Sequence, residues 1–520
     1  MSGYFSDREE IFPSIFIEST EDNTQSLAMR EGGQVCGMGW VNVGNPLHPI
    51  AMSSLSQRVK TTNKRLYKGD AKLNAFKNMS AYTIKDFHRN SNNRTLHLSR
   101  IMGIDSTIKI VKVEKVGEEL LLTSASEVDI FKNGTMESWE ELESTSPIEM
   151  LIKFCPTSKV TVRASCEEDV LTVYIEDEFA RTLYKVSGNT DPHHLDDGGT
   201  SDYIGNRANC NYLTIKTDIE HVDYLSDFSI SETYNTGLAK DLGDWEFTTF
   251  HKKNLRKVMQ KSSYFVALGV ESVILLEDAR RIAHEFSTRM IMDLVTKDLS
   301  TAVLKKTTLG FSDEDTDWFW SRADYRFTEG VQNIALSGLY TGIRTKVNID
   351  GKKGRAENRM VGIAGVDYPI NRTITCGLED LTREEKIILT NNRINTIETR
   401  TVGSRDVLVF SDVLSGHDKN TQQKSSPIAD TISFMKKEAG FIMEAVLFKS
   451  NTNAEARFRF EFNLFIEDCK RNNYFDLNVD EPVGYTMHVA NAEEQILEIW
   501  AYMDGVMRKG RVKFSMRKGA

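Results

Sequence analysis

Residues 264–299, YFVALGVESVILLEDARRIAHEFSTRMIMDLVTKDL, decide the fold class of this chain. The run VESVILL (270–276) is short and apolar, which is typical of a strand buried on both faces. Helical patterns flank it, in FHKKNLRKVMQKSSYF (250–265) and in LEDARRIAHEFSTRMIMDLVTKDL (276–299). Because a helix precedes and follows the run, we expect an α/β unit here.

Other patterns surround this unit. A block at 107–186 predicts a β-rich domain, through the strand-like segments TIKIVKV, ELLLTSA, SKVTVRA, DVLTVYIED and RTLYKVSG. Further on, Asp380 or Thr382 is expected to cap a helix, and two strands are expected to join at Gly403. Helical patterns at 428–445 and 454–470 then precede GYTMHVA, ILEIWAYM and RVKFSM, which resemble strands. The prediction is an α+β multidomain protein.

The bulk properties exclude several classes. A chain of 520 residues is too long for one ordinary core. Its net charge of -10 argues against a general nucleic-acid binder, and the longest nearly apolar run is too short for a membrane span. The N-terminus has acids where a signal peptide needs bases. Six scattered Cys favour reduced thiols in a cytoplasm, with interchain disulfides as the alternative. We expect protein partners.

Candidate enzyme motifs are weak. DPHHLDDGG (191–199) contains two His and three Asp, but adjacent His side chains rarely converge on one metal, so a polar surface loop is favoured. GKKGR (351–355) lacks the Lys-Ser/Thr ending of a phosphate loop and is interpreted as a basic turn. Asp313, Glu314 and Asp315 are interpreted as a solvated acidic face. We therefore expect no catalytic residue, no metal and no cofactor.

The C-terminal tail is basic and strand-like. Residues 508–520 contain six Lys or Arg and no acid, and Val512, Phe514 and Met516 alternate with polar residues. Such a segment could close its own domain, or it could be donated to the sheet edge of another copy. The residues alone leave both readings open.

The C-terminal third resembles the tail sheath proteins of contractile phage tails and related injection machines. The stretches that carry the resemblance occur in the family's order: GIAGVDYPI (362–370), LTREEKIILTNNRINTIETRTVGSRDVLVFSDVL (381–414), FIMEAVLFKSNTNAEARFRFEFNLFIEDCKRNNYFDLNVD (441–480) and EEQILEIWAYMDGVMRKGRVKFSM (493–516). Upstream, FPSIFIEST resembles the family's N-terminal arm, and VESVILLEDARRIAHEFSTRMIMDL resembles an α/β segment that ends on an apolar strand. This chain has VLVFSDVL where many sheath proteins have Trp-Gly-Ala-Arg-Thr.

The resemblance implies a division of the chain. It predicts a C-terminal α/β sheath core, terminal arms that donate strands, and inserted β-rich and α/β outer domains. The expected parts are an N-terminal arm (1–30), an N-terminal part of the sheath domains (31–106), a β-rich outer domain (107–186), an α/β domain (187–345), the sheath core (346–500) and a C-terminal arm (501–520).

The resemblance also implies contact residues. The intersubunit residues would be Ser14, Ile15, Phe16, Ile17 and Glu18 in the N-terminal arm, and Arg511, Val512, Lys513, Phe514, Ser515, Met516 and Arg517 in the C-terminal arm. The helix from Arg457 to Arg471 would face an inner tube, through Arg457, Arg459, Lys470 and Arg471.

The implied function is structural. Sheath subunits stack as hexameric rings around an inner tail tube, contact baseplate and tail terminator proteins, and contract to drive the tube through the host envelope. The implied location is a virion tail assembled in the bacterial host cytoplasm, with no nucleic acid bound and no membrane insertion. A static baseplate or tail-completion protein of related fold is the alternative, and a hydrolase that uses His193 and His194 is a third class.

Overall fold

The computed structural model describes residues 34–504, apart from several gaps. The gaps are 40–48, 54–70, 101–108, 117–118, 125–146, 153–158, 178–181, 209–212, 218–227, 236–248, 328–329, 373–377, 447–450, 490–494 and the single residues 197, 271, 312, 323, 334, 379 and 420. Both predicted terminal arm segments, 14–18 and 511–517, lie outside the described residues.

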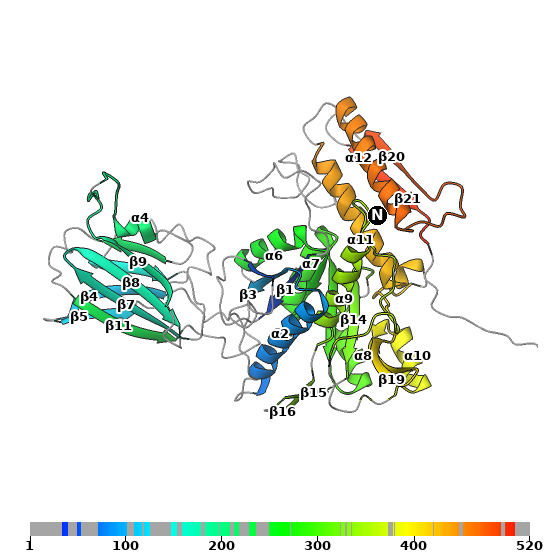
Figure 1. The fold of residues 1–520 in the computed structure, drawn as a ribbon, viewed down its shortest axis with the longest axis horizontal. Coiled ribbons are helices and arrows are strands. Elements are labelled where there is room, and N and C mark those ends of the chain that lie inside the picture. Colours follow the sequence, from blue (N-terminus) through cyan, green and yellow to red (C-terminus); the bar gives the residue numbers. More distant parts are fainter. Residues whose placement is uncertain are drawn as a thin grey trace, which may run out of the picture.

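A seven-stranded sheet forms the centre of the molecule (Figure 1). Its order is β17 (Ile394–Asn395), β14 (Thr316–Ser321), β13 (Arg289–Val295), β12 (Tyr264–Val266), β1 (Val35–Gly39), β3 (Leu96–Arg100) and β2 (Ile50–Met52). All neighbouring pairs are parallel except β2 with β3. The predicted α/β unit is therefore confirmed.

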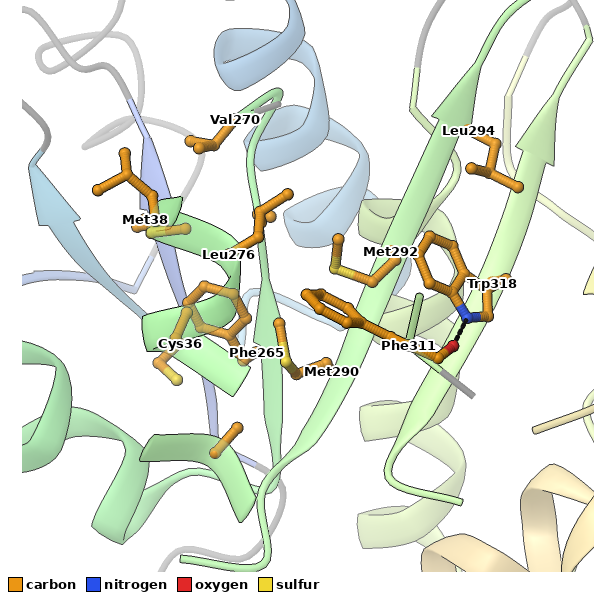
Figure 2. Packing of buried hydrophobic residues seen from close by; sticks show 14 of the residues in the cluster. Cys36, Met38, Phe265, Val270, Leu276, Met290, Met292, Leu294, Phe311 and Trp318 are labelled. Atoms are coloured by element: carbon orange, nitrogen blue, oxygen red, sulfur yellow. Dashed lines mark hydrogen bonds between the residues drawn. The ribbon is translucent and has the colours of Figure 1, made fainter. Parts of the chain in front are cut away.

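Helices cover both faces of this sheet. One face packs against α6 (Thr249–Lys261), α7 (Val273–Glu285), α8 (Leu299–Leu309) and α10 (Arg383–Asn391). The other packs against α2 (Ala71–Asn90) and α9 (Ser337–Asp350). Side chains of β13 alternate between the two cores, with Met290 and Met292 on the first and Ile291 on the second. Figure 2 shows the first core, in which Trp318 Nε1 donates to the carbonyl oxygen of Phe311 at 3.1 Å.

The reading of VESVILL as a strand is wrong, because Val273 begins helix α7. Buried residues of α7 recur at helical spacing, at Leu275, Leu276, Ala279, Ile282 and Ala283. Val273 and Ile274 remain 45% and 71% exposed. The buried strands are instead β12, before this run, and β13, which begins inside the segment that was interpreted as helical.

A β-sandwich forms a second unit, placed beside the α/β body in Figure 1. One sheet has the order β10 (Leu213–Thr217), β6 (Ile148–Ile152), β4 (Lys109–Val116), β5 (Glu119–Ser124). The other has the order β11 (Phe228–Asn235), β7 (Lys159–Glu167), β8 (Val170–Asp177), β9 (Thr182–Asn189), and the short helix α4 (Ile204–Ala208) packs on the shared core. Since β10 and β11 belong to these sheets, the β-rich unit continues past residue 186, where its end was predicted.

A C-terminal unit follows the body. Helices α11 (Ser426–Glu444) and α12 (Asn451–Arg471) pack with the antiparallel pair β20 (Val483–Val489) and β21 (Gln495–Ala501) around one core. Before it, Thr382 caps α10 in a capping box, and Gly403, with φ +62°, joins β18 (Ile397–Val402) to β19 (Arg405–Phe410), both as predicted. A small hairpin, β15 (Asp324–Phe327) with β16 (Gly330–Asn333), and a short 3-10 turn η2 (Gln422–Lys424) complete the described elements. Within the described ranges, no helix is long and apolar enough to cross a membrane.

Candidate assembly site in the C-terminal unit

The hairpin β20–β21 has two unlike faces. Its inner face packs on the helical core through Val483, Tyr485, Leu497, Ile499 and Ala501. The alternation of the strand places the next side chains along β21 on the outer face. There Trp500 and Tyr502 are 44% and 56% exposed, and Glu498 is also exposed. No third strand from the described residues joins this sheet.

Helix α12 presents an apolar stripe to solvent. Its buried face carries Phe458, Phe462, Phe465, Ile466 and Cys469. On the opposite face, Phe460 and Leu464 are 63% and 45% exposed. Sequence reasoning missed this pair, although its spacing of four residues, out of phase with the buried positions, was a usable signal.

The four predicted tube-facing residues do not share one face. At about 100° per residue, Arg457 and Arg471 lie on the outward face with Phe460 and Leu464, whereas Arg459 and Lys470 lie on its flank. Three of the four are paired within the helix: Arg459 with Glu455 at 2.6 Å, Lys470 with Glu467 at 2.7 Å, and Arg471 with Asp468. Their positive charge is thus largely compensated.

The GKKGR turn fastens the C-terminal end of α12. Lys353 Nζ donates to the carbonyl oxygen of Arg471 at 2.8 Å, a favourable place for a cation because helix dipoles end in negative partial charge. The backbone N–H of Arg355 donates to Asp468 at 2.7 Å, and the Arg355 side chain pairs with Glu461 at 2.8 Å. Gly354, with φ +64°, lies so close to Asp468 that an added Cβ would be 2.2 Å from its Oδ2. The predicted basic turn is confirmed and has a structural role.

A buried ionic network fastens α11 to the sheet. Asp430 accepts hydrogen bonds from Tyr264 (2.6 Å), Arg344 Nε (3.0 Å) and Arg359 Nη1 (2.7 Å). Asp317 accepts from Arg289 and, at 2.7 Å, from Ser426. Its three acids and three Arg are each at most 1% exposed. The members of the network are Tyr264, Arg289, Asp317, Tyr340, Arg344, Asn348, Glu357, Arg359, Ser426 and Asp430.

The neighbouring guanidiniums keep Asp430 ionised. Burial alone would raise the pKa of Asp430, but the three guanidiniums outweigh it and hold that pKa below the ordinary value. Burial also raises the pKa of Tyr264 well above its usual range, so the phenol remains a hydrogen-bond donor. Because the members come from β12, β13, β14, α9, the loop after α9 and α11, the network joins the α/β body to the C-terminal unit.

The acidic run at 313–315 is not a solvated face, which corrects the sequence interpretation. Asp315 is 7% exposed, accepts from Ser433 of α11 at 3.1 Å and lies 3.0 Å from His284 Nδ1 of α7. The hydrogen bond to Asp315 raises the pKa of His284. Asp313 pairs with Arg280 at 2.8 Å. These acids therefore hold α7 and α11 against the start of β14.

The DPHHLDD loop lies in the β-sandwich, away from the C-terminal unit. His193 and His194 are both exposed, and His194 Nδ1 lies 2.6 Å from Asp202, whose hydrogen bond raises the pKa of His194. Among the residues that the structure describes, no group of three or more His, Cys, Asp or Glu is placed to hold a metal ion. Cys36, Cys166 and Cys469 are buried free thiols.

Comparison with known proteins gives structural matches only. No protein-family model matches the sequence, and no curated protein matches it. The chain is similar to the sheath tail protein of Desulfitobacterium hafniense, at 10% identity and a TM-score of 0.45, with 94% of this chain and 100% of that chain covered. It is similar to a sheath tail protein of Listeria innocua, at 8% identity and a TM-score of 0.48, with 91% and 95% covered. It is also similar to the helical sheath of the anti-feeding prophage in its contracted state, at 10% identity and a TM-score of 0.48, with 97% of this chain and 98% of that chain covered. These three structures are sheath proteins, and each of the three TM-scores lies below 0.5.

Proposed function

We propose that this protein is a structural subunit of a contractile tail sheath. Six subunits form a ring, and stacked rings surround an inner tail tube in a virion tail assembled in the bacterial host cytoplasm. Contraction of the sheath drives the tube through the host envelope. Baseplate and tail terminator proteins contact the two ends of the sheath.

The two-stranded hairpin β20–β21 carries this proposal. A single hairpin is marginal in water. Here the helical core stabilises its inner face, and no third strand from the described residues pairs with it, so a donated strand could extend the sheet. The chain itself carries segments suited to such an edge, with Val512, Phe514 and Met516 alternating in the C-terminal arm and Ser14 to Glu18 in the N-terminal arm. Each added backbone hydrogen bond contributes about 0.5–1.5 kcal/mol. Arms exchanged between copies would link every subunit to its neighbours.

The outward face of α12 is the proposed contact with the inner tube. Phe460 and Leu464 offer apolar area, and Arg457 and Arg471 frame it with polar groups. Arg459 and Lys470 on the flank would meet the edge of the same contact. An apolar centre with a polar rim is the usual anatomy of a specific protein interface.

Contraction needs two sets of subunit contacts rather than an active site. In a bistable lattice, the free-energy difference between the extended and contracted packings drives the change. Arms held by backbone hydrogen bonds would act as hinged tethers while subunits rotate outward. The β-sandwich and the outer α/β elements would meet neighbouring subunits mainly after contraction.

Electron microscopy of the purified protein, with and without residues 508–520, tests the proposal. We expect the complete chain to form long tubes of two diameters and the truncated chain to remain as single subunits or short rings. A fixed small ring would favour the baseplate or tail-completion alternative and contradict the sheath. Unchanged polymerisation after truncation would contradict strand donation by the C-terminal arm. Replacement of His193 and His194 by Ala is expected to leave assembly unaffected, and a loss of hydrolytic activity in that variant would support the third class.

A further inference from the structure

The acid excess of the chain is confined to the β-sandwich. Residues 109–235, from the start of β4 to the end of β11, contain 25 Asp or Glu and 11 Lys or Arg, a net charge of -14. The rest of the chain contains 50 Asp or Glu and 54 Lys or Arg, a net charge of +4. Two copies therefore attract each other when the sandwich of one lies against the remainder of the other.

One end of the sandwich carries an acidic tip, formed by the β7–β8 turn (167–169) and the loop after β9 (190–202). These two segments contain seven Asp or Glu and no Lys or Arg. The backbone N–H of Thr190 donates to the carbonyl oxygen of Asp169 at 3.0 Å, which holds the loop against the turn. The exposed acids of the tip are Glu167, Glu168, Asp169, Asp191 and Asp196.

The tip lies far from the point where the chain leaves the sandwich. Asn235, the last residue of β11, pairs with Lys159 at the start of β7, whereas the turn of the tip follows Glu167 at the end of β7. At about 3.3 Å per residue, the length of β7 separates these two ends by about 26 Å. The chain continues from Asn235 to α6, so the tip is at the end of the sandwich remote from that connection. A second copy is thus better placed than the same chain to meet the tip.

Helix α6 is strongly basic. Its thirteen residues include five Lys or Arg and no acid. Two of these bases are compensated by the neighbouring helix α7 (Figure 1), because Lys252 lies 2.9 Å from Asp278 and Arg256 lies 2.5 Å from Glu285. The apolar side of α6 packs on the sheet through Leu255, Val258 and Met259.

The remaining bases of α6 point away from the sheet. Lys253, Lys257 and Lys261 recur every four residues, a spacing that places positions on one face of a helix. At about 100° per residue, Lys257 lies opposite the side that carries Leu255 and Met259. Lys257 is partly exposed and Lys261 is exposed, and neither makes an ion pair with a described residue. This outward face therefore carries uncompensated positive charge.

We propose that the outward face of α6, which carries Lys257 and Lys261, binds the acidic tip of the β-sandwich of a second copy of the chain. The inference rests on the proposed function, in which copies pack side by side and the sandwich meets neighbouring subunits. It involves neither the terminal arms nor the C-terminal unit. Because the tip and α6 are different surfaces, the contact is head-to-tail and can repeat from copy to copy around a ring or along a helical assembly.

Cross-linking of the complete chain tests the contact. Equal amounts of unlabelled and 15N-labelled protein are mixed before assembly and treated with a carbodiimide, which joins a Lys amine directly to a neighbouring carboxyl group. Mass spectrometry of the digested protein then identifies the joined peptides. We expect links from Lys257 or Lys261 to acids of the tip, with about half of them joining a labelled to an unlabelled peptide.

Charge reversal tests the same contact without cross-linking. Lys257→Glu with Lys261→Glu should raise the protein concentration needed for assembly about tenfold, as measured by sedimentation. Adding Glu167→Lys and Glu168→Lys restores opposite charges across the contact and should recover most of this loss. The matched control is Lys346→Glu with Lys352→Glu, which makes the same change in net charge at exposed positions in and after α9 and should change that concentration by less than about twofold.

The outcomes distinguish this inference from the proposed function. Links from α6 to the tip that never join differently labelled peptides, or the absence of such links, would overturn the contact between copies even if the protein forms tubes. Equal effects of the two double reversals would overturn it as well. A wild-type protein that forms no tubes, yet gives links between differently labelled peptides, would overturn the sheath proposal alone.

Discussion

The buried ionic network predicts a large effect from one small substitution, Asp430→Asn. The carboxylate accepts from Tyr264, Arg344 and Arg359, and the substituted amide would turn an N–H toward at least one of these donors. The change also leaves three Arg against two acids in a cluster that is at most 1% exposed. Removing one partner of a buried ion pair typically costs about 3–5 kcal/mol, so we expect a loss of that size.

Urea denaturation measures this loss. Trp318 and Trp320 in β14 are 0% and 3% exposed, so their fluorescence follows unfolding of the α/β body, to which the network fastens α11. The matched control is Glu455→Gln, which breaks the exposed pair with Arg459 on the adjacent helix. An exposed pair at this spacing contributes only about 0.3–0.5 kcal/mol. The midpoint should therefore fall clearly for Asp430→Asn and barely for Glu455→Gln.

A second substitution tests whether charge balance is the cause. Arg344→Met added to Asp430→Asn restores equal numbers of buried acids and bases. If charge imbalance causes the destabilisation, the double variant should lose less free energy of unfolding than the two single variants lose together, because the effects of neighbouring residues in one network are not additive. Strictly additive losses, or equal midpoints for Asp430→Asn and Glu455→Gln, would refute it.

Three other substitutions give independent checks. Burial raises the pKa of Asp293 to about 6. An acid whose pKa is raised by folding lowers the stability of the protein as pH rises through that value. In paired thermal melts, Asp293→Asn should therefore be more stable than the wild type by about 2–3 kcal/mol above pH ~6, and this difference should disappear below pH ~4. Phe460→Ala should weaken cosedimentation with the inner tube protein while changing the free energy of unfolding by less than about 0.5 kcal/mol. The control is Leu195→Ala, which removes an exposed apolar side chain of the β-sandwich unit, outside the proposed contact. Gly338→Ala should destabilise the protein by about 1–3 kcal/mol in the same melts, because its Cβ would lie 2.2 Å from the carbonyl oxygen of Thr83 in α2.

Local signals in the sequence were sufficient for much of the C-terminal unit. The helices expected at 428–445 and 454–470 begin at Ser426 and Asn451, because their apolar residues recur at helical spacing over many turns. The cap at Thr382 and the strand joint at Gly403 depend on adjacent residues only, and both are present.

The sequence-based predictions were wrong where residues far away in the sequence determine the local structure or the burial of a side chain. The apolar run at 270–276 is too short for its period to separate strand from helix, and packing of α7 on the sheet settles it. The run at 313–315 looks solvated in sequence, yet Ser433, the partner of Asp315 in α11, is 118 positions away. Tyr264 and Asp430 are separated by 166 positions, and no local pattern encodes such a pair.

The contacts within the subunit and the proposed contacts between subunits differ in strength, and this difference indicates which of them would break first in a contracting sheath. Helix α11 is joined to the body by a network in which one broken pair costs about 3–5 kcal/mol, and α12 is fastened at its C-terminal end by Lys353 and Arg355. A donated strand contributes about 0.5–1.5 kcal/mol per backbone hydrogen bond, and these bonds open one at a time at the end of a strand. Tension between subunits would therefore fray or pivot the arms before it separates the hairpin from its own body. That ordering is what a tether must have if the subunits are to move as rigid bodies and remain connected.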